Sequence, residues 1–357
     1  MFIFKYLLWP FAWLYNLATL IRNYLYDIGH KKSFEFDTVV ISVGNLNVGG
    51  SGKTPMIEYL IRLLADRYQL ATLSRGYGRK THGIRISSET DNACTLGDEP
   101  FQLSRKFEGN IKVVVGEERA LAIPTILHQF PEVQVILMDD AFQHRAVRPQ
   151  FSILVTDCEK PFYKDFLLPY GRLREARKGA GRADVIVVTK ADGITEAEKE
   201  LMSSSVHEVA GVKPIFFSGL SYQLPMPIHH ENQIGEKVVL VSGIAKNSHF
   251  VREVSKLYQV VRHFRFVDHH HYSEENIQRI QQCADEFQVD SILTTEKDMV
   301  KLITPQLLPL LQNKNWFYLP IRSVFLKGGI HFDEMILRVV EEKIQALSPV
   351  KNSDSLN

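Results

Sequence analysis

The chain has 357 residues, and 42 Lys and Arg stand against 41 Asp and Glu, so the formal net charge is +1 with histidine neutral. Hydrophobic residues make up 45% and charged residues 23%, as in ordinary globular proteins. This composition excludes a disordered chain and a basic protein that coats nucleic acid through charge alone. We therefore expect no nucleic-acid partner, and nothing in the sequence indicates an obligate protein partner. The three cysteines form no CxxC pair, which is typical of a reducing, cytosolic setting.

The first segment, residues 1–30, is strongly apolar and contains Trp9 and Trp13. Its charge-free run, residues 6–21, has 16 residues, which is short of the ~20 that span hydrocarbon. Lysine and arginine flank the run, where they could meet anionic head groups: Lys5, Arg22, Lys31 and Lys32. We expect an interfacial helix on an anionic membrane surface, with a buried core helix as the alternative. A cleaved signal peptide is disfavoured because no A-x-A site closes the run.

Short apolar runs then alternate with helical or loop stretches. Buried strands are predicted at residues 38–43, 112–115, 133–138, 151–155 and 184–188, and a helix at 55–67. A second alternation has strands at 238–241, 260–266 and 291–294 and helices at 248–257 and 273–287. Strands separated by crossover segments indicate parallel sheets, so the fold class is α/β with a second, smaller α/β domain. The expected boundaries are 1–30 for the interfacial helix, 31–217 for the first domain, 218–235 for a linker, 236–328 for the second domain and return linker, 329–347 for a last helix and 348–357 for a flexible tail.

A glycine-rich segment joins the first predicted strand to the first helix. It consists of Asn47, Val48, Gly49, Gly50, Ser51, Gly52, Lys53 and Thr54. The pattern matches the phosphate-binding loop G-x-x-x-x-G-K-[ST] except that asparagine takes the place of the first glycine. Asparagine tolerates a positive φ better than most side chains. Backbone N–H groups at a helix N-terminus bind phosphate, Lys53 would reach the transferred phosphate, and Thr54 would offer its hydroxyl to Mg²⁺.

Two acidic residues, Asp139 and Asp140, close the strand predicted at 133–138. A carboxylate at this place holds Mg²⁺ in phosphate-loop enzymes, although acidic residues could also begin a turn. The next residues, Gln143, His144 and Arg145, would bring an amide, an imidazole and a guanidinium beside the metal.

The run Thr189-Lys190-Ala191-Asp192 follows the strand predicted at 184–188. It resembles the N-K-x-D motif with which GTPases read guanine, so a membrane-associated GTPase or ATPase switch is the main alternative function. The segment after Asp139 lacks the glycine of the GTPase D-x-x-G motif, which argues against a switch. A transport ATPase is a third possibility, but no signature of that class follows the loop. A surface turn would give the same Lys-x-Asp pattern.

Several motifs together resemble the tetraacyldisaccharide 4′-kinases, which make lipid A precursors in Gram-negative bacteria. They are the phosphate loop, Ser74-Arg75-Gly76-Tyr77-Gly78-Arg79, Gly97-Asp98-Glu99-Pro100, Asp139-Asp140-Ala141-Phe142-Gln143-His144-Arg145, Leu173-Arg174-Glu175 and Asp268-His269-His270. The resemblance implies a P-loop NTPase-like α/β/α sandwich, a two-stranded linker and an active site between two domains. It also implies ATP-dependent phosphorylation of the 4′-hydroxyl of a tetraacyldisaccharide 1-phosphate lipid, at the cytoplasmic face of the bacterial inner membrane.

The resemblance also implies roles for particular residues. Asp98 matches the general base, and the catalytic set is Asp98, Lys53, Asp140, His269 and Arg174. Nucleotide binding falls to the loop residues 47–54 with Gln143 and Arg119, whereas Arg172 could equally be an ordinary surface arginine. Mg²⁺ would be held by Thr54 and Asp139, with Glu99 and Glu175 as further candidates. The loop 74–79 would serve the acceptor lipid or the nucleotide.

The run Asp268-His269-His270-His271 could suggest a metal site, but consecutive residues rarely aim at one ion and no zinc-ligand spacing surrounds it. The resemblance suggests that a histidine of the second domain pairs with an active-site aspartate. His269 is our choice, with His270 in reserve. The alternative for at least one of the histidines is a capping turn before the helix predicted at 273–287.

Overall fold

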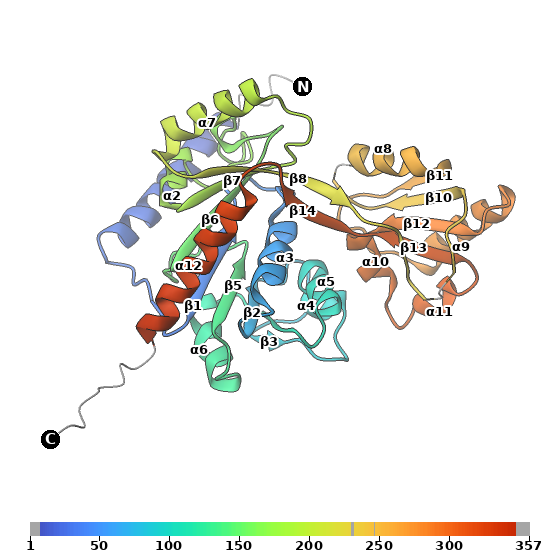
Figure 1. Ribbon diagram of the computed structural model, residues 1–357, viewed down its shortest axis with the longest axis horizontal. Helices are drawn as coiled ribbons and strands as arrows, with labels where there is room; N and C mark the ends of the chain where they lie inside the picture. The colour runs from blue at the N-terminus through green and yellow to red at the C-terminus, as the bar shows by residue number, and fades with distance from the viewer. Residues whose placement is uncertain (1–7, 230–231, 246, 348–357) are drawn as a thin grey trace. The chain divides into compact units, whose positions relative to one another are not determined.

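The computed structural model describes residues 8–229, 232–245 and 247–347. Predictions for residues 1–7 and for the tail 348–357 lie outside this part of the chain. The chain divides into two compact units, coloured along the sequence in Figure 1. The first unit comprises Met1–Arg75, Gly109–Gly219 and Ser323–Asn357, and the second comprises Gly76–Glu108 and Leu220–Arg322. Residues 76–108 thus pack in the second unit, whereas the sequence analysis included them in the segment 31–217.

The large sheet of the first unit has a parallel centre. Its strands lie in the order β14 (Ile321–Phe325), β8 (Ile215–Tyr222), β7 (Val185–Thr189), β6 (Phe151–Asp157), β1 (Val39–Gly44), β5 (Val135–Asp139), β2 (Leu70–Ser74) and β4 (Ile111–Val115). β1 pairs in parallel with β5 and β6, in the registers Val39↔Val135 and Ile41↔Phe151. Every residue of β1 is buried, as expected for a central strand covered on both faces.

Helices pack on this sheet. α3 (Lys53–Leu64) packs on β1 and β5, α6 (Arg119–Gln129) on β2, and α12 (Gly329–Leu347) on β1. α7 (Glu196–Ala210) packs on the short 3₁₀ helix η2 (Arg177–Arg182), and a second 3₁₀ helix, η1, covers Phe162–Lys164. The buried residues of α3 include Met56, Ile57, Leu60, Ile61 and Leu64, which is the 3.6-residue spacing predicted from the sequence.

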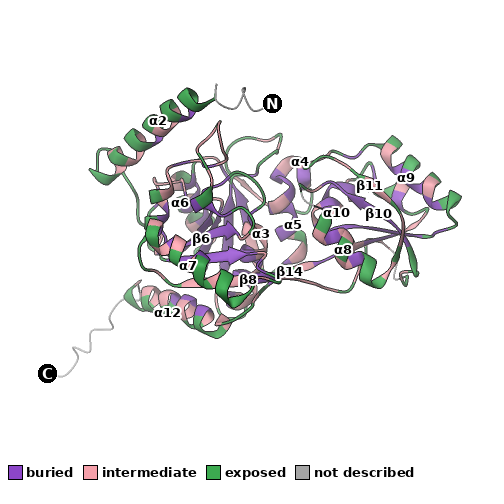
Figure 2. Cartoon of the chain, turned by 90° about the horizontal axis from the view of Figure 1, so that it is seen from above, coloured by how far each residue is buried: buried purple, intermediate pink, exposed green. Residues whose placement is uncertain are grey.

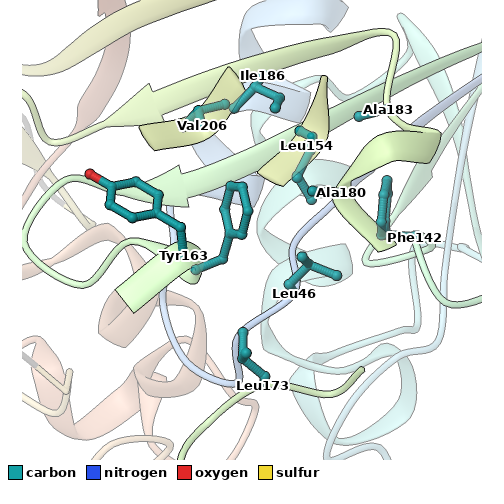
Figure 3. Packing of buried hydrophobic residues seen from close by; sticks show 11 residues of the cluster. Leu46, Phe142, Leu154, Tyr163, Leu173, Ala180, Ala183, Ile186 and Val206 are labelled. Carbon is teal, nitrogen blue, oxygen red and sulfur yellow. The ribbon is translucent and has the colours of Figure 1, made fainter. Parts of the chain in front are cut away.

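One buried cluster of the first unit lies beneath three segments that carry predicted site residues (Figure 3). Leu46 belongs to the segment after β1, Phe142 to the segment after β5, and Leu173 directly precedes Arg174; all three are nearly inaccessible to solvent. They pack with Leu154, Phe162, Tyr163, Ala180, Ala183, Ile186, Val206 and Ala210. Burial of a large apolar side chain stabilises a fold by about 1.5–3 kcal/mol. The cluster therefore anchors these three segments to one another.

The N-terminal helix α2 (Trp9–Asp27) has its polar and apolar faces reversed relative to a normal surface helix. Its buried and half-buried positions repeat at helical spacing and include Ala12, Tyr15, Asn16, Thr19, Arg22 and Asn23. Its exposed positions are mostly large and apolar: Trp9, Phe11, Trp13, Leu14, Leu17, Leu20 and Ile21. The exposed face of α2 can be followed in Figure 2. Within the described residues, no helix combines the length and the apolar character needed to cross a membrane.

The second unit is built on a smaller sheet in the order β11 (Gln259–Arg265), β10 (Lys237–Ser242), β12 (Ser291–Thr295), β13 (Asn315–Leu319) and β9 (Met226–Pro227). The first four strands are parallel, and β9 pairs antiparallel with β13. Its helices are α8 (Ser248–Leu257), α9 (Glu274–Glu286), α10 (Glu296–Leu302) and α11 (Leu308–Leu311). α4 (Ala93–Leu96), α5 (Asp98–Lys106) and the short strand β3 (Arg85–Ile86) also belong to this unit, and α5 packs on α10.

Candidate active site

The segment between β1 and α3 has the geometry of an anion-binding loop. Gly52 is the N-cap of α3 with φ 86°, a conformation that favours glycine, and Lys53 is the first helical residue. No side chain caps the first turn of α3. The N–H groups at a helix start carry partial positive charge and bind anions when they are available. The strand, loop and helix expected from the sequence are all present.

Asn47 does not play the part expected of it. It is absent from the non-glycine residues with positive φ, which in the described chain are Asp140, Lys190, His269 and Gln288. Its side-chain amide instead donates to Oδ2 of Asp165 at 2.7 Å, and the residue is 7% exposed. The expectation that asparagine replaces glycine because it tolerates positive φ is therefore wrong. Asn47 is held by a side-chain hydrogen bond that glycine could not make.

The loop is also tied through its backbone to the segment before Arg174. The N–H of Val48 donates to the carbonyl of Arg172 at 2.8 Å, and the N–H of Arg174 donates to the carbonyl of Leu46 at 2.7 Å. Asp165 joins this pairing, because it accepts from Asn47 and forms an ion pair with Arg172 at 2.9 Å. Asp165 was not among the residues predicted for the site. No local pattern marks it, since its partner Asn47 lies 118 residues away.

A cluster of charges surrounds the start of α3. Nζ of Lys53 lies 3.7 Å from Oδ1 of Asp140, and Nη1 of Arg174 donates to both Asp140 oxygens at 2.8 and 2.9 Å. Burial raises the pKa of Asp140, but Lys53 and Arg174 outweigh this effect and hold the pKa below its usual range. Asp140 is thus a carboxylate at neutral pH. The structure brings together the predicted residues Lys53, Asp140 and Arg174.

Glu175 lies in a different environment from the metal shell expected for it. It has no exposed surface, and its Oε1 accepts from Arg182 at 2.8 Å and from Gln143 Nε2 at 3.1 Å. Its Oε2 accepts from Asn23 Nδ2 at 2.9 Å. Both carboxylate oxygens thus bind donors of the chain itself, where the sequence analysis expected Mg²⁺. Gln143 also donates to the carbonyl of Asn45 at 2.9 Å, which ties the segment after β5 to the loop.

The two residues after Gln143 have separate roles. Burial and the nearby charges of Arg119 and Arg75 together lower the pKa of His144 to about 4, so the imidazole is neutral at pH 7. Arg145 does not face the metal position: Nη1 donates to the carbonyl of Asn23 at 2.8 Å and Nη2 to Asp27 at 2.7 Å. Its predicted place beside the metal is therefore wrong. Arg145 instead fastens the C-terminal end of α2, where a cation is favoured.

Arg119 is a buried arginine, 2% exposed, at the first position of α6. Burial lowers its pKa to about 10, and the charge of Asp140 opposes that effect. The guanidinium therefore stays protonated at neutral pH and contributes positive charge to the surroundings of Asp140. Its expected part in neutralising phosphate stays a prediction, for a side chain that is almost fully buried.

The Thr189-Lys190 segment lies against the phosphate loop and is not a free surface turn. Oγ1 of Thr189 donates to the carbonyl of Ser51 at 2.7 Å. Nζ of Lys190 donates to the carbonyl of Gly50 at 2.5 Å and to Oδ2 of Asp157 at 2.8 Å. The end of β7 thus supports the phosphate loop through two side-chain hydrogen bonds.

The groups expected to hold Mg²⁺ are hard oxygen donors. Asp139 ends β5, is 3% exposed and lies beside Val43 of β1, and Thr54 is in the first turn of α3. Magnesium is usually held by one or two protein oxygens together with substrate phosphates. Over residues 8–229, 232–245 and 247–347, no group of three or more His, Cys, Asp and Glu could hold a metal by itself. This donor set fits an ion that binds together with a nucleotide.

The second unit contains the other predicted catalytic residues. Nδ1 of His269 lies 3.0 Å from Oδ2 of Asp98, and Nε2 of His269 lies 3.2 Å from Nζ of Lys297. An ammonium group can only donate, so Nε2 accepts and Nδ1 carries the proton that is donated to Asp98. Burial raises the pKa of Asp98, but the His269 hydrogen bond and the charges of Lys301 and Lys297 hold it below its usual range. The predicted pairing of Asp98 with His269 is present, within a single unit.

Neighbouring residues refine the predictions for this pair. Asp98 is not in a turn: it is the first residue of α5, preceded by Gly97. Oε1 of Glu99, a residue predicted as a candidate Mg²⁺ ligand, lies 3.8 Å from Nζ of Lys297. Nε2 of His270 donates to Oδ1 of Asn276 at 2.9 Å, and the imidazole ring stacks on Phe266, which places His270 in the capping turn before α9. The alternative of a structural turn thus holds for His270.

Comparison with known proteins bears on both units. The family model for the tetraacyldisaccharide-1-P 4′-kinase matches residues 4–341. The chain belongs to this family. It is 42% identical to the tetraacyldisaccharide 4′-kinase of Flavobacterium johnsoniae over 95% of this chain and 98% of the relative, and 43% identical to that of Flavobacterium psychrophilum over 94% and 96%. It also resembles the solved structure of LpxK from Aquifex aeolicus in complex with ATP, with a TM-score of 0.73 and 30% identity over 94% of this chain and 99% of that one. Membership makes a GTPase switch or transport ATPase the less favoured function.

Proposed function

We propose that this member of the kinase family transfers the γ-phosphate of ATP to the 4′-hydroxyl of a tetraacyldisaccharide 1-phosphate lipid A precursor. One observation carries the proposal. Lys53 begins a helix directly after a glycine-rich loop and faces Asp140, which Arg174 grips at 2.8 and 2.9 Å. This arrangement suits a polyphosphate, and two relatives of the chain are named tetraacyldisaccharide 4′-kinase, after a disaccharide acceptor.

Each group has a definite part in the proposed reaction. The loop N–H groups and Lys53 bind and orient the phosphates, and Arg174 and Arg119 add positive charge as the leaving group forms. Bound Mg²⁺, held by Thr54 and Asp139, would offset charge on the phosphates. The acceptor oxygen forms a bond to the γ-phosphorus while the bond to the β-phosphate oxygen breaks, and ADP leaves. Asp98 takes the proton of the acceptor hydroxyl.

The low pKa of Asp98 decides how such a base must work. A carboxylate whose pKa lies below its usual range is a weak base at neutral pH. Its contribution must come from correct placement and from being unprotonated at every working pH. His269, protonated at Nδ1 and held at Nε2 by Lys297, would fix the orientation of the carboxylate. We propose His269 as the positioning partner of Asp98.

We further propose that the protein works at the cytoplasmic face of the bacterial inner membrane, with α2 lying in the interface. The apolar face of α2 is exposed, with Trp9 61% and Trp13 56% accessible. Aromatic side chains with polar tips favour the region of the lipid head groups, and Lys31 and Lys32 follow the helix where anionic lipids could meet them. Arg22 was predicted to meet lipid head groups, but its Nη2 donates to the backbone carbonyl of Gln143 at 3.4 Å.

The test is transfer of labelled phosphate from ATP to a tetraacyldisaccharide 1-phosphate in mixed micelles. We expect a phosphorylated lipid and no comparable nucleotide hydrolysis when the lipid is omitted. A GTPase or ATPase would consume nucleotide without the acceptor. Hydrolysis at the same rate with and without lipid, and no labelled lipid, would contradict the proposed function.

A further inference from the structure

The helix α2 contacts the segments that carry the phosphate-site residues. The hydroxyl of Tyr15 donates to the carbonyl of Arg174 at 2.8 Å. Nδ2 of Asn23 donates to Oε2 of Glu175 at 2.9 Å. The backbone carbonyl of Asn23 accepts a hydrogen bond from Nη1 of Arg145 at 2.8 Å. Each of these three bonds joins residues that lie 122 or more positions apart in the sequence. They show that the inward face of α2 is polar because it is bonded to the loop bearing Arg174.

Glu175 transmits this contact to the other side of the site. Its carboxylate is fully buried and receives three donors, from Asn23, Gln143 and Arg182. A buried carboxylate is costly unless its oxygens are bonded, so loss of one donor disturbs the others. Gln143 in turn donates to the carbonyl of Asn45, two residues before the phosphate loop, and Nδ2 of Asn45 donates to the carbonyl of Asn47 within it at 2.6 Å. A continuous chain of hydrogen bonds therefore runs from α2 to the loop.

Two bonds from α2 thus converge on one short segment, residues 174–175. Arg174 is the residue whose guanidinium grips Asp140, and its own N–H is bonded to Leu46. Fixing the backbone of Arg174 on both sides restricts where its guanidinium can point. Positioning of this kind matters in catalysis, since small misplacements of a charged group lower the rate.

We propose that α2 is a structural part of the phosphate site, with Tyr15 and Asn23 as positioning residues for Arg174 and Gln143. The proposal rests on the proposed kinase function and adds a second role to the interfacial helix. The two faces of α2 then do separable work: the outward apolar face meets lipid, and the inward polar face holds the site. Deleting the whole helix would mix the two effects, whereas single substitutions separate them.

The experiment measures kcat, the KM for acceptor lipid and vesicle sedimentation for point variants of the full chain. Tyr15→Phe removes a neutral hydrogen bond and should lower kcat by about fivefold. Asn23→Ala removes a hydrogen bond to a carboxylate and should lower kcat by about tenfold. Their lipid KM and their partition onto vesicles of phosphatidylethanolamine and phosphatidylglycerol should stay within twofold of wild type (about 0.4 kcal/mol). The matched control is Tyr24→Phe, which removes the same hydroxyl from a residue 61% exposed on the same helix and should leave kcat unchanged.

The outward face supplies the opposite result. Trp9→Ser combined with Trp13→Ser should raise the lipid KM and lower vesicle partition while kcat at saturating micellar lipid is kept. All rates are referred to the folded fraction measured by near-ultraviolet circular dichroism. The inference is overturned if Tyr15→Phe and Asn23→Ala keep the wild-type kcat, or if they lower only the partition of the protein onto vesicles. It is also overturned if the decrease in kcat disappears once the rates are referred to the folded fraction. Failure of wild type to phosphorylate lipid in the same assay would instead reject the proposed function.

Discussion

Arg174 holds Asp140 with a single nitrogen, Nη1, which lies 2.8 Å from one carboxylate oxygen and 2.9 Å from the other. Lys53 approaches the same carboxylate at 3.7 Å from the start of α3. Asp140 itself has φ 49°, in the left-handed region that few side chains adopt. The two cations are thus held in place around an unusual backbone conformation before any phosphate arrives, which is the condition for electrostatic stabilisation without reorganisation.

Lys53→Ala and Thr54→Ala should each lower phosphate transfer by roughly 10²–10³-fold, because each removes a group that offsets charge in the transition state. The fold should survive, since Lys53 and Thr54 are only partly buried in the first turn of α3. Steady-state transfer together with circular dichroism checks both statements. Near-normal turnover by folded Lys53→Ala protein would remove the phosphate-site interpretation.

Asn47→Gly should harm the protein, even though it restores the more usual loop sequence. The substitution removes the amide that donates to Asp165 at 2.7 Å, a bond to a charged group worth roughly 1.5–3 kcal/mol. Asn47→Ala should lower the free energy of unfolding by a similar amount, and Asn47→Asp by more, because it opposes two carboxylates. Urea unfolding measures the series. Greater stability of Asn47→Gly would mean that backbone freedom, and not the amide, matters here.

The local pattern of the sequence was sufficient for some parts of the fold. The strand–loop–helix of residues 39–64 and the helix α8 follow from apolar periodicity and glycine placement, and both are confirmed. Residues 218–235, which were expected to be a linker, include the end of β8 and the strand β9. These strands have little periodicity of their own, and β9 exists through its pairing with β13.

The site shows the same division. Lys53, Asp140, Asp98 and His269 could be named because short motifs carry them. Glu175 and Asn47 could be named but were given the wrong surroundings, since their partners Asn23 and Asp165 lie 152 and 118 residues away. A sequence without an alignment holds no signal for such pairs. The division of residues 76–108 from the first unit likewise depends on tertiary contacts.

Asp98→Asn should lower kcat by about 10²–10⁴-fold with little change in the Kd for ATP, because it keeps the shape of the side chain and removes the base. Isothermal titration and steady-state kinetics measure the two quantities. Loss of ATP affinity at unchanged kcat would place Asp98 with the nucleotide or its metal and reject its role as base.

His269→Ala should shift the acid limb of the pH–rate profile to higher pH. The hydrogen bond from His269 lowers the pKa of Asp98, so its removal raises that pKa, and Asp98 becomes protonated at a higher pH. The same depressed pKa means that Asp98 stabilises the fold above about pH 4 and that this contribution is lost as the pH falls through the folded-state pKa. An acid limb that stays in place or moves to lower pH would contradict the pairing.

Gly44→Ala should destabilise the first unit. A Cβ at this position would lie 2.6 Å from Cβ and 2.7 Å from the backbone nitrogen of Phe142, so the end of β1 and the segment after β5 would have to separate. We expect the free energy of unfolding to fall by roughly 1–3 kcal/mol. Gly50→Ala is the control for stability, because a Cβ there meets nothing within 4 Å. Equal stability of the two variants in urea unfolding would contradict the close approach.

The central claim is that the charges around Lys53 serve phosphate transfer to a lipid hydroxyl. The most direct measurement follows the γ-phosphate of labelled ATP into lipid with two acceptors, the tetraacyldisaccharide 1-phosphate and its 4′-deoxy analogue, using wild type and Lys53→Ala. The account predicts labelled lipid only for wild type with the natural acceptor, and no label with the analogue. Label in the 4′-deoxy lipid, or equal nucleotide turnover with both acceptors and with none, would contradict it.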